Sequence, residues 1–208
     1  VSVAILAAVV SASAVELDGW TSHSPRDEIR PQFSTEPRGG PGDQPALLIR
    51  ADGREGLDGF WQKSFPVTGG KGHRFQAFYR AANVAVPRRS VVVRLLWLAA
   101  DGQRAALDEP KVPGVLPGWK PVAEAEHPAT RGADHSGWTE VSGLYRAPSN
   151  ATSARVELHL QWAPNAEVRW AGVSLAEATP PVPRVVRLAA VHFRPQGNRT
   201  PMENCRAF

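Results

Sequence analysis

The side chains best suited to bind a ligand lie in one long segment, residues 108–136, between two stretches with β-strand patterns. The segment supplies an indole ring, carboxylates and imidazoles, which can stack on an apolar ring face and hydrogen bond to hydroxyl groups. Connections this long are uncommon in a compact domain and are often functional. If the domain binds a ligand, or covers a catalytic domain, we expect four residues to do so: Trp119, His127, Asp134 and His135. A mobile, proline-rich loop with an anchoring tryptophan is the simpler competing interpretation.

Catalytic and metal-binding patterns are absent from the sequence. The six histidines include no pair at the spacing of a zinc site such as HExxH. The single cysteine, Cys205, excludes both a cysteine-rich metal site and an intrachain disulfide. We interpret Cys205 as a packing or surface residue, because no partner base is in view. The sequence therefore predicts no catalytic residue, no metal site and no cofactor in this chain.

The positive charge of the chain is dispersed. Lysine and arginine number 24 against 20 acidic residues, which gives a net charge of +4, and the longest cationic run is Arg88-Arg89. Nucleic-acid-binding proteins gather their basic residues into a patch or stripe. We therefore expect no nucleic-acid partner.

Seven stretches have the pattern of β-strands. The cleanest is 153–162, in which Val156, Leu158, Leu160 and Trp162 share one face and Arg155, Glu157, His159 and Gln161 share the other. Alternation of this kind predicts a sheet with one buried and one solvated face, so we expect the second set to face water. The expected strands cover residues 46–51, 59–67, 73–81, 90–102, 137–148, 153–162 and 167–178.

Details of these stretches predict their places in the fold. Residues 90–102 are apolar on both faces except for Arg94, which favours a central strand. In residues 167–178 the larger apolar side chains occupy even-numbered positions in the first half and odd-numbered positions in the second half. This change favours a bulge near Ala171-Gly172. Residues 20–45 are polar and rich in proline and glycine, and we interpret them as irregular. Trp97 and Trp162 are assigned to the core and Trp138 to a structural role, whereas Trp61 and Trp170 stay undecided.

Short strands, Gly/Pro turns and little helical periodicity predict an all-β fold, an antiparallel jelly-roll β-sandwich spanning residues 15–178. The stretches "SVVVRLLWLAADG", "GWTEVSGLYRAPSNATSARVELHLQW" and "VRWAGVSL" resemble the jelly-roll carbohydrate-binding modules with a galactose-binding-like sandwich. The resemblance covers most of residues 60–178 and implies a polysaccharide or glycan partner. Such modules usually carry acidic residues where Ala171-Gly172 stand here, so no calcium site is inferred for that strand.

The first residues resemble part of a signal peptide. An apolar run over 3–10 is followed by Ala12-Ser13-Ala14, the small-x-small pattern of a cleavage site. The run is too short to cross a bilayer, and a buried N-terminal strand is the alternative. We therefore expect residues 1–14 to direct export to the periplasm, cell surface or exterior, with no membrane association beyond the signal peptide.

The last residues have the pattern of a second, incomplete domain. Residues 179–184 form a proline-rich linker, and 185–193 match a strand buried in an α/β sheet. Thr200, Pro201 and Glu203 then predict a capped helix start. Residues 185–208 contain too few large apolar side chains to fold alone. We therefore expect an isolated strand and helix start from an incomplete α/β domain.

The stretch "VRLAAVHFRPQGNRTPMENCRAF" resembles the opening of the carbon–nitrogen hydrolase (nitrilase) superfamily over residues 187–208, with His192 where glutamine is usual. The resemblance implies an enzyme with a Glu-Lys-Cys triad, all of it downstream of this helix. The chain would then be an inactive N-terminal fragment of an exported hydrolase, and its missing catalytic domain would be a partner. A non-enzymatic carbohydrate-binding protein and a protein-interaction domain are the alternatives.

Overall fold

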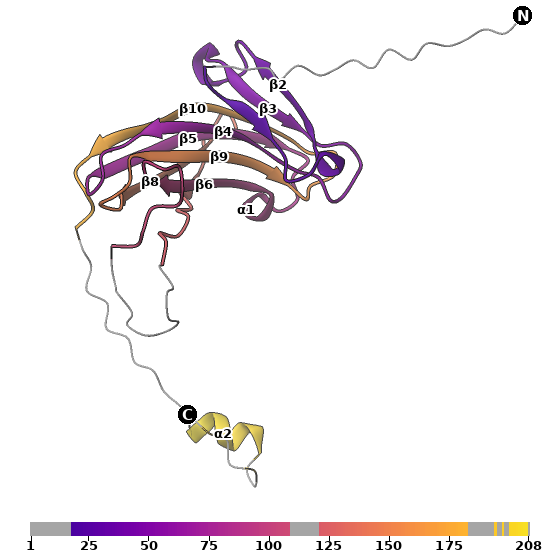
Figure 1. Ribbon diagram of the computed structural model, residues 1–208. Helices are drawn as coiled ribbons and strands as arrows, with labels where there is room; N and C mark the ends of the chain where they lie inside the picture. The colour runs from indigo at the N-terminus through magenta and orange to yellow at the C-terminus, as the bar shows by residue number, and fades with distance from the viewer. Residues whose placement is uncertain (1–17, 109–120, 183–193, 195–196, 198–199, 208) are drawn as a thin grey trace, which may run out of the picture.

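Two antiparallel β-sheets pack face to face to form a sandwich (Figure 1). The computed structural model describes residues 18–108, 121–182, 194, 197 and 200–207. The four-stranded sheet has the order β1-β4-β9-β6, and the six-stranded sheet has the order β2-β3-β10-β5-β8-β7. Every pairing within these sheets is antiparallel. The predicted all-β sandwich is confirmed.

Period-two side-chain patterns define most of the strands. The four-stranded sheet contains β1 (Thr21–His23), β4 (Asp58–Pro66), β9 (Ser153–Gln161) and β6 (Val91–Leu98). The six-stranded sheet contains β2 (Gln32–Glu36), β3 (Ala46–Arg50), β10 (Glu167–Ala178), β5 (Gly72–Ala82), β8 (Thr139–Arg146) and β7 (Ala129–Ala133). The short helices are η1 (Asp27–Ile29), η2 (Pro41–Asp43), α1 (Pro87–Ser90) and α2 (Pro201–Ala207).

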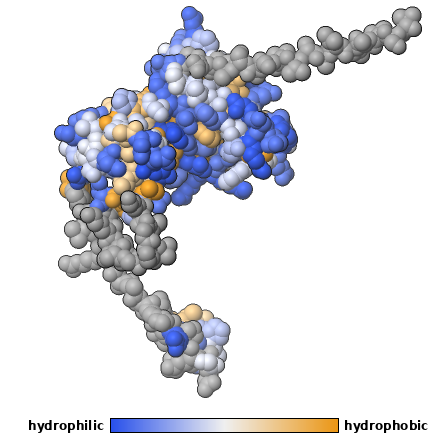
Figure 2. Space-filling model, in the orientation of Figure 1, coloured by the Kyte–Doolittle hydropathy of each residue, from blue (hydrophilic) through white to orange (hydrophobic). Residues whose placement is uncertain are grey.

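Large aromatic side chains fill the space between the sheets. Trp61, Trp97 and Trp170 are buried in one core cluster, and Trp138 is buried in a smaller one. Burying a tryptophan removes about 150–250 Å² from water, which stabilises the fold by roughly 4–6 kcal/mol per residue. The predicted core position of Trp97 is confirmed. On the face seen in Figure 2, hydrophilic side chains cover most of the sandwich, as expected when the apolar ones are gathered inside.

Two expectations about strand placement are wrong. Strand β6 is at the edge of its sheet and not at the centre. Its outer side is instead bordered by the segment that follows it, through bridges from Leu95 to Glu126 and from Leu98 to Arg104. Residues 20–45 are not wholly irregular either, since they contain β1 and β2. These strands have three and five residues, too few to give a visible alternation.

The predicted bulge in β10 is confirmed. The register with β5 shifts between Ala171 and Ser174, and Gly172 has a φ of 59°. Only glycine adopts this left-handed conformation without steric cost. The bulge therefore explains why the two halves of β10 present their apolar residues with opposite parity.

Trp162 contradicts the sequence interpretation. Its predicted core position is wrong, because the side chain is 47% exposed. Its φ of 54° rotates the residue out of the alternation that buries Leu160. Holding a bulky residue in the left-handed region costs on the order of 1–3 kcal/mol.

The C-terminal helix begins with the predicted capping box. The Glu203 N–H donates to Thr200 Oγ1 at 3.3 Å, and the Thr200 N–H donates to Glu203 Oε2 at 2.8 Å. Figure 1 shows α2 separate from the sandwich. The predicted signal peptide over 1–14 and the predicted strand over 185–193 lie outside the described residues. No helix among the residues described is both long and apolar enough to span a membrane.

Candidate functional site

The outward side chains of the four-stranded sheet form a surface that we call the outer face. Alternate residues of β9 from Ala154 to Leu160 are buried in the core, so the residues between them point to the other side. Pairing places Phe60 and Val92 on either side of His159, in β4 and β6. The outer face comprises Thr21, His23, Asp58, Phe60, Gln62, Ser64, Val92, Arg94, Leu96, Arg155, Glu157, His159 and Gln161.

Three rings stack across three strands of the outer face. The centroids of His23 and Phe60 are 5.6 Å apart with an interplanar angle of 17°. Those of Phe60 and His159 are 4.5 Å apart with an angle of 29°. Because the three residues are cross-strand neighbours, the strand register fixes this stack.

His159 lies between two carboxylates beside this stack. Its Nε2 is 3.2 Å from Glu157 Oε2, and its Nδ1 is 3.7 Å from Asp58 Oδ1. The expectation that His159 and Glu157 face water is wrong, since their side chains are only 2% and 10% exposed. The expectation fails for Gln161 as well, which is buried. Alternation predicts which way a side chain points but not whether its neighbours cover it.

The outer face also holds buried polar atoms that lack a hydrogen-bond partner. In the described part of the chain six such side-chain atoms occur, and four belong to this face. An unsatisfied buried polar atom costs about 1–3 kcal/mol, and native folds contain few of them. The outer face therefore holds most of the uncompensated buried polar atoms among the residues that the structure describes. The four atoms are Asp58 Oδ1, Arg155 Nε, His159 Nδ1 and Gln161 Oε1.

The structure separates the ligand-binding residues predicted from the sequence. His127 lines a pocket of about 730 Å³ beside β6, which Val92 also lines. Asp134 accepts hydrogen bonds from the Ser136 hydroxyl and from the Trp138 N–H, and these lower the pKa of Asp134. Asp134 thus closes the turn between β7 and β8. His135 is exposed in that turn, with β7 between it and His127. Trp119 lies outside the described residues.

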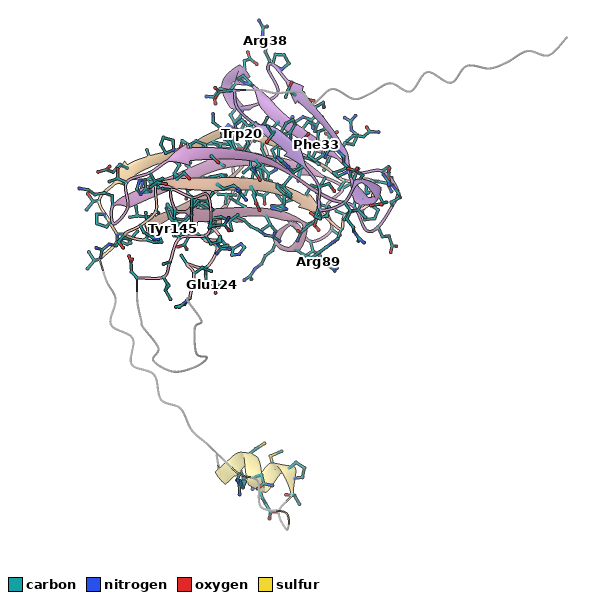
Figure 3. The ribbon with its side chains drawn as sticks, in the orientation of Figure 1. Trp20, Phe33, Arg38, Arg89, Glu124 and Tyr145 are labelled. Atoms are coloured by element: carbon teal, nitrogen blue, oxygen red, sulfur yellow. The ribbon has the colours of Figure 1, made fainter. Side chains whose placement is uncertain are left out.

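A second polar pocket adjoins β6. Its volume is about 450 Å³, and Trp97, Glu124, Glu126 and Arg146 contribute to its lining. Burial raises the pKa of Glu126, although the Trp97 indole N–H donates to Glu126 Oε1 at 3.4 Å and opposes that rise. Figure 3 shows Glu124 below the sandwich, on the same side as Tyr145. Burial, and secondarily the charge of Glu126, raises the pKa of Tyr145 to about 12.

The described residues contain no group of three His, Cys, Asp or Glu side chains able to hold a metal ion. The sequence analysis missed the outer face as a site, although one signal was present. Four consecutive outward positions of β9 are all polar and include an acid, an imidazole and an amide.

No family model matches the chain, and no curated protein sequence matches it. Solved structures are similar in fold. The enzymatically active domain of tailspike protein 4 from bacteriophage CBA120 has a TM-score of 0.55 at 8% identity, covering 77% of this chain and 20% of that one. The CBM22-1 and GH10 modules of Clostridium thermocellum endo-1,4-β-D-xylanase 10B, complexed with xylohexaose, give 0.49 at 13%, covering 81% and 28%. A family 16 carbohydrate-binding module gives 0.48 at 12%, covering 71% and 86%.

The chain thus spans about a fifth of the tailspike chain and just over a quarter of the xylanase chain. At 8% identity the similarity to the tailspike domain shows the fold alone. The carbon–nitrogen hydrolase resemblance of residues 187–208 has no counterpart in these comparisons and stays a prediction.

Proposed function

We propose that the sandwich binds a polysaccharide chain on the outer face of the four-stranded sheet. One observation carries the proposal: an aromatic stack and several hydrogen-bonding side chains lie side by side on the outer face. Sugars combine the two complementary properties, since their hydroxyl groups donate and accept hydrogen bonds and their ring faces are apolar.

The donors and acceptors of the outer face suit hydroxyl groups. The side chains of Asp58 and Gln161 carry oxygen acceptors, and the Arg155 guanidinium carries N–H donors. His159 Nδ1 can be either, according to its tautomer. A hydroxyl group satisfies both kinds of atom, whereas a phosphate would meet the carboxylates of Asp58 and Glu157. The mixed charges therefore favour a neutral ligand over a nucleic acid.

The shape of the outer face suits a chain and not a single sugar. Four strands at about 4.8 Å spacing give a surface roughly 14 Å wide. Phe60 and His23 are half-buried and present ring surface on this face. Partial burial leaves the rings accessible while limiting the side-chain freedom lost on binding.

On this proposal the sandwich is an accessory binding module of a larger exported protein. The carbon–nitrogen hydrolase resemblance supports an amidase or nitrilase as the rest of that protein. Trp119, His127, Asp134 and His135 stay as predicted contributors, with the pocket of His127 adjoining the outer face through Val92. The alternative is a protein-interaction domain. Such a domain would not require hydrogen-bonding side chains placed beside the aromatic rings at the spacing of sugar hydroxyl groups.

Affinity electrophoresis of the full chain tests the proposal on xylan, mixed-linkage β-glucan, galactomannan, glycol chitin and pectin. We expect saturable binding to at least one neutral polysaccharide, weakened about tenfold or more by Phe60→Ala. Phe78→Ala is the matched control, because Phe78 is also half-buried but lies on the six-stranded sheet against Trp138. The proposal would be contradicted if no polysaccharide retarded the wild-type chain, or if Phe60→Ala and Phe78→Ala lost affinity equally.

A further inference from the structure

Trp162 has a backbone conformation that its side chain disfavours. Among the described residues five non-glycine positions have positive φ, and the other four are aspartate or asparagine. Those side chains tolerate the left-handed region, whereas a bulky aromatic residue there is an outlier. Backbone hydrogen bonds hold the turn, with the Trp162 N–H donating to Leu57 O at 2.8 Å. Outliers held this firmly cluster at functional sites.

The strained backbone turns the Trp162 ring toward solvent. The other five tryptophans that the structure describes are buried, while Trp162 is 47% exposed. The Arg89 guanidinium lies 5.5 Å from the Trp162 ring centroid, within the range of a cation–π contact. Arg89 belongs to α1, and Figure 3 shows it at the lower right of the sandwich. The ring is thus presented in a fixed orientation at that end.

The surroundings of Trp162 form a shallow depression of about 640 Å³. Glu55, Gly56, Arg89 and Pro164 complete its lining. It therefore pairs one aromatic surface with one carboxylate and one guanidinium, and both charged groups can hydrogen bond to hydroxyls. An aromatic ring edged by hydrogen-bonding groups matches the two kinds of surface of a pyranose ring.

The depression and the outer face are linked through Gln161. Gln161 belongs to the outer face and precedes Trp162, and its Nε2 donates to Arg89 O at 3.0 Å. Asp58, in β4, is the cross-strand neighbour of Gln161 and lies on the same face. A ligand that lies along this end of the outer face would therefore come close to Arg89 and Trp162.

We infer that Trp162 and Arg89 form a terminal ring-stacking subsite for a neutral pyranose unit of the polysaccharide bound on the outer face. This inference rests on the proposed function. It requires a ligand long enough to reach both places, so that short oligosaccharides bind without using Trp162.

Trp162→Asn separates this role from a structural one. Asparagine tolerates the left-handed backbone, so thermal unfolding should occur at an unchanged or higher temperature. Titration calorimetry should show about tenfold weaker binding of hexasaccharides from the polysaccharide that wild type binds, with disaccharide binding unchanged. Trp162→Phe, which keeps a ring, should restore most of the hexasaccharide affinity.

Comparison with Phe60→Ala separates the failure of the inference from that of the proposed function. If Phe60→Ala abolishes binding but Trp162→Asn binds hexasaccharides like wild type, the subsite is overturned and the outer face stands. A lowered unfolding temperature for Trp162→Asn, with equal losses for short and long ligands, would assign Trp162 a structural role and overturn the subsite. If wild type binds no polysaccharide, both fail.

Discussion

Arg169 on β10 binds Glu36 on β2 through two hydrogen bonds, of 2.7 and 3.0 Å, that pass over the intervening strand β3. Arg169 also contacts Glu167, which accepts two hydrogen bonds from Arg50 on β3. The network thus joins three strands of the six-stranded sheet, and all of its side chains except that of Arg50 are partly buried. Networks of this kind contribute more than isolated surface pairs.

Replacing Arg169 with methionine should lower the free energy of unfolding by about 1–2 kcal/mol, because Glu36 and Glu167 would lose their shared partner. Urea denaturation of the full chain measures the change. The control is Arg54→Met, since Arg54 is exposed and its carboxylate partner, Asp52, is only two residues away, while its other hydrogen bonds are to backbone oxygens of Glu28 and Arg30. Equal unfolding midpoints for Arg169→Met and wild type would show that the network adds no stability.

Glu167 should make the sandwich sensitive to acid. Burial tends to raise the pKa of Glu167, but the hydrogen bonds from Arg50 and Arg169 outweigh it and hold that pKa below its ordinary value. A carboxylate with a lowered folded pKa stabilises the fold above its unfolded pKa, about 4.3, and this contribution is lost as pH falls through the folded value. The free energy of unfolding should therefore fall less steeply below pH 4.3 in Glu167→Gln than in wild type. If the free energy of unfolding fell equally steeply with pH in Glu167→Gln and in wild type, this prediction would be contradicted.

Glu126 should change the pH dependence of stability in the direction opposite to that of Glu167. Its pKa is raised, mainly by burial, so the folded state binds the proton more tightly than the unfolded state. Stability is then greatest below the unfolded pKa and is lost as pH rises through the folded value. Glu126→Gln removes the charge and keeps an oxygen acceptor for the Trp97 N–H. The unfolding temperature of Glu126→Gln should exceed that of wild type at pH 7, and this difference should disappear at pH 4.

The bulge in β10 should tolerate only glycine. Gly172→Ala places a methyl group in the left-handed region and about 3.0 Å from Phe78 Cδ2. Gly102 also has positive φ, but a methyl group there would meet nothing within 4 Å. Both alanine variants pay a backbone cost of about 1–2 kcal/mol. Gly172→Ala should unfold at a lower urea concentration than Gly102→Ala, and the reverse order would contradict the packing argument.

Local patterns predicted most of the strands and the bulge, because alternation is encoded residue by residue. They did not predict that β6 is an edge strand, since strand order depends on pairings between distant segments, such as Leu95 with Val156. The burial of His159 could not be predicted for the same reason, because Phe60 covers it from another strand.

Trp162 was misassigned by extending the alternation of β9 one residue too far. Pro164 and Asn165 follow closely and are turn residues, so they could have placed the strand end at Gln161. The positive φ of Trp162 itself has no sequence signal, because tryptophan is among the residues least suited to it. The three-ring stack was equally hidden, since it unites residues 23, 60 and 159.

The bridges from Leu95 to Glu126 and from Leu98 to Arg104 bear on solubility. An edge strand with free amide and carbonyl groups can recruit a strand from another molecule, and β6 is rich in the valine and leucine that favour such growth. The segment lying alongside β6 occupies part of that edge. Shortening this segment would expose β6 and promote aggregation, so evolution or engineering could vary its side chains more freely than its backbone.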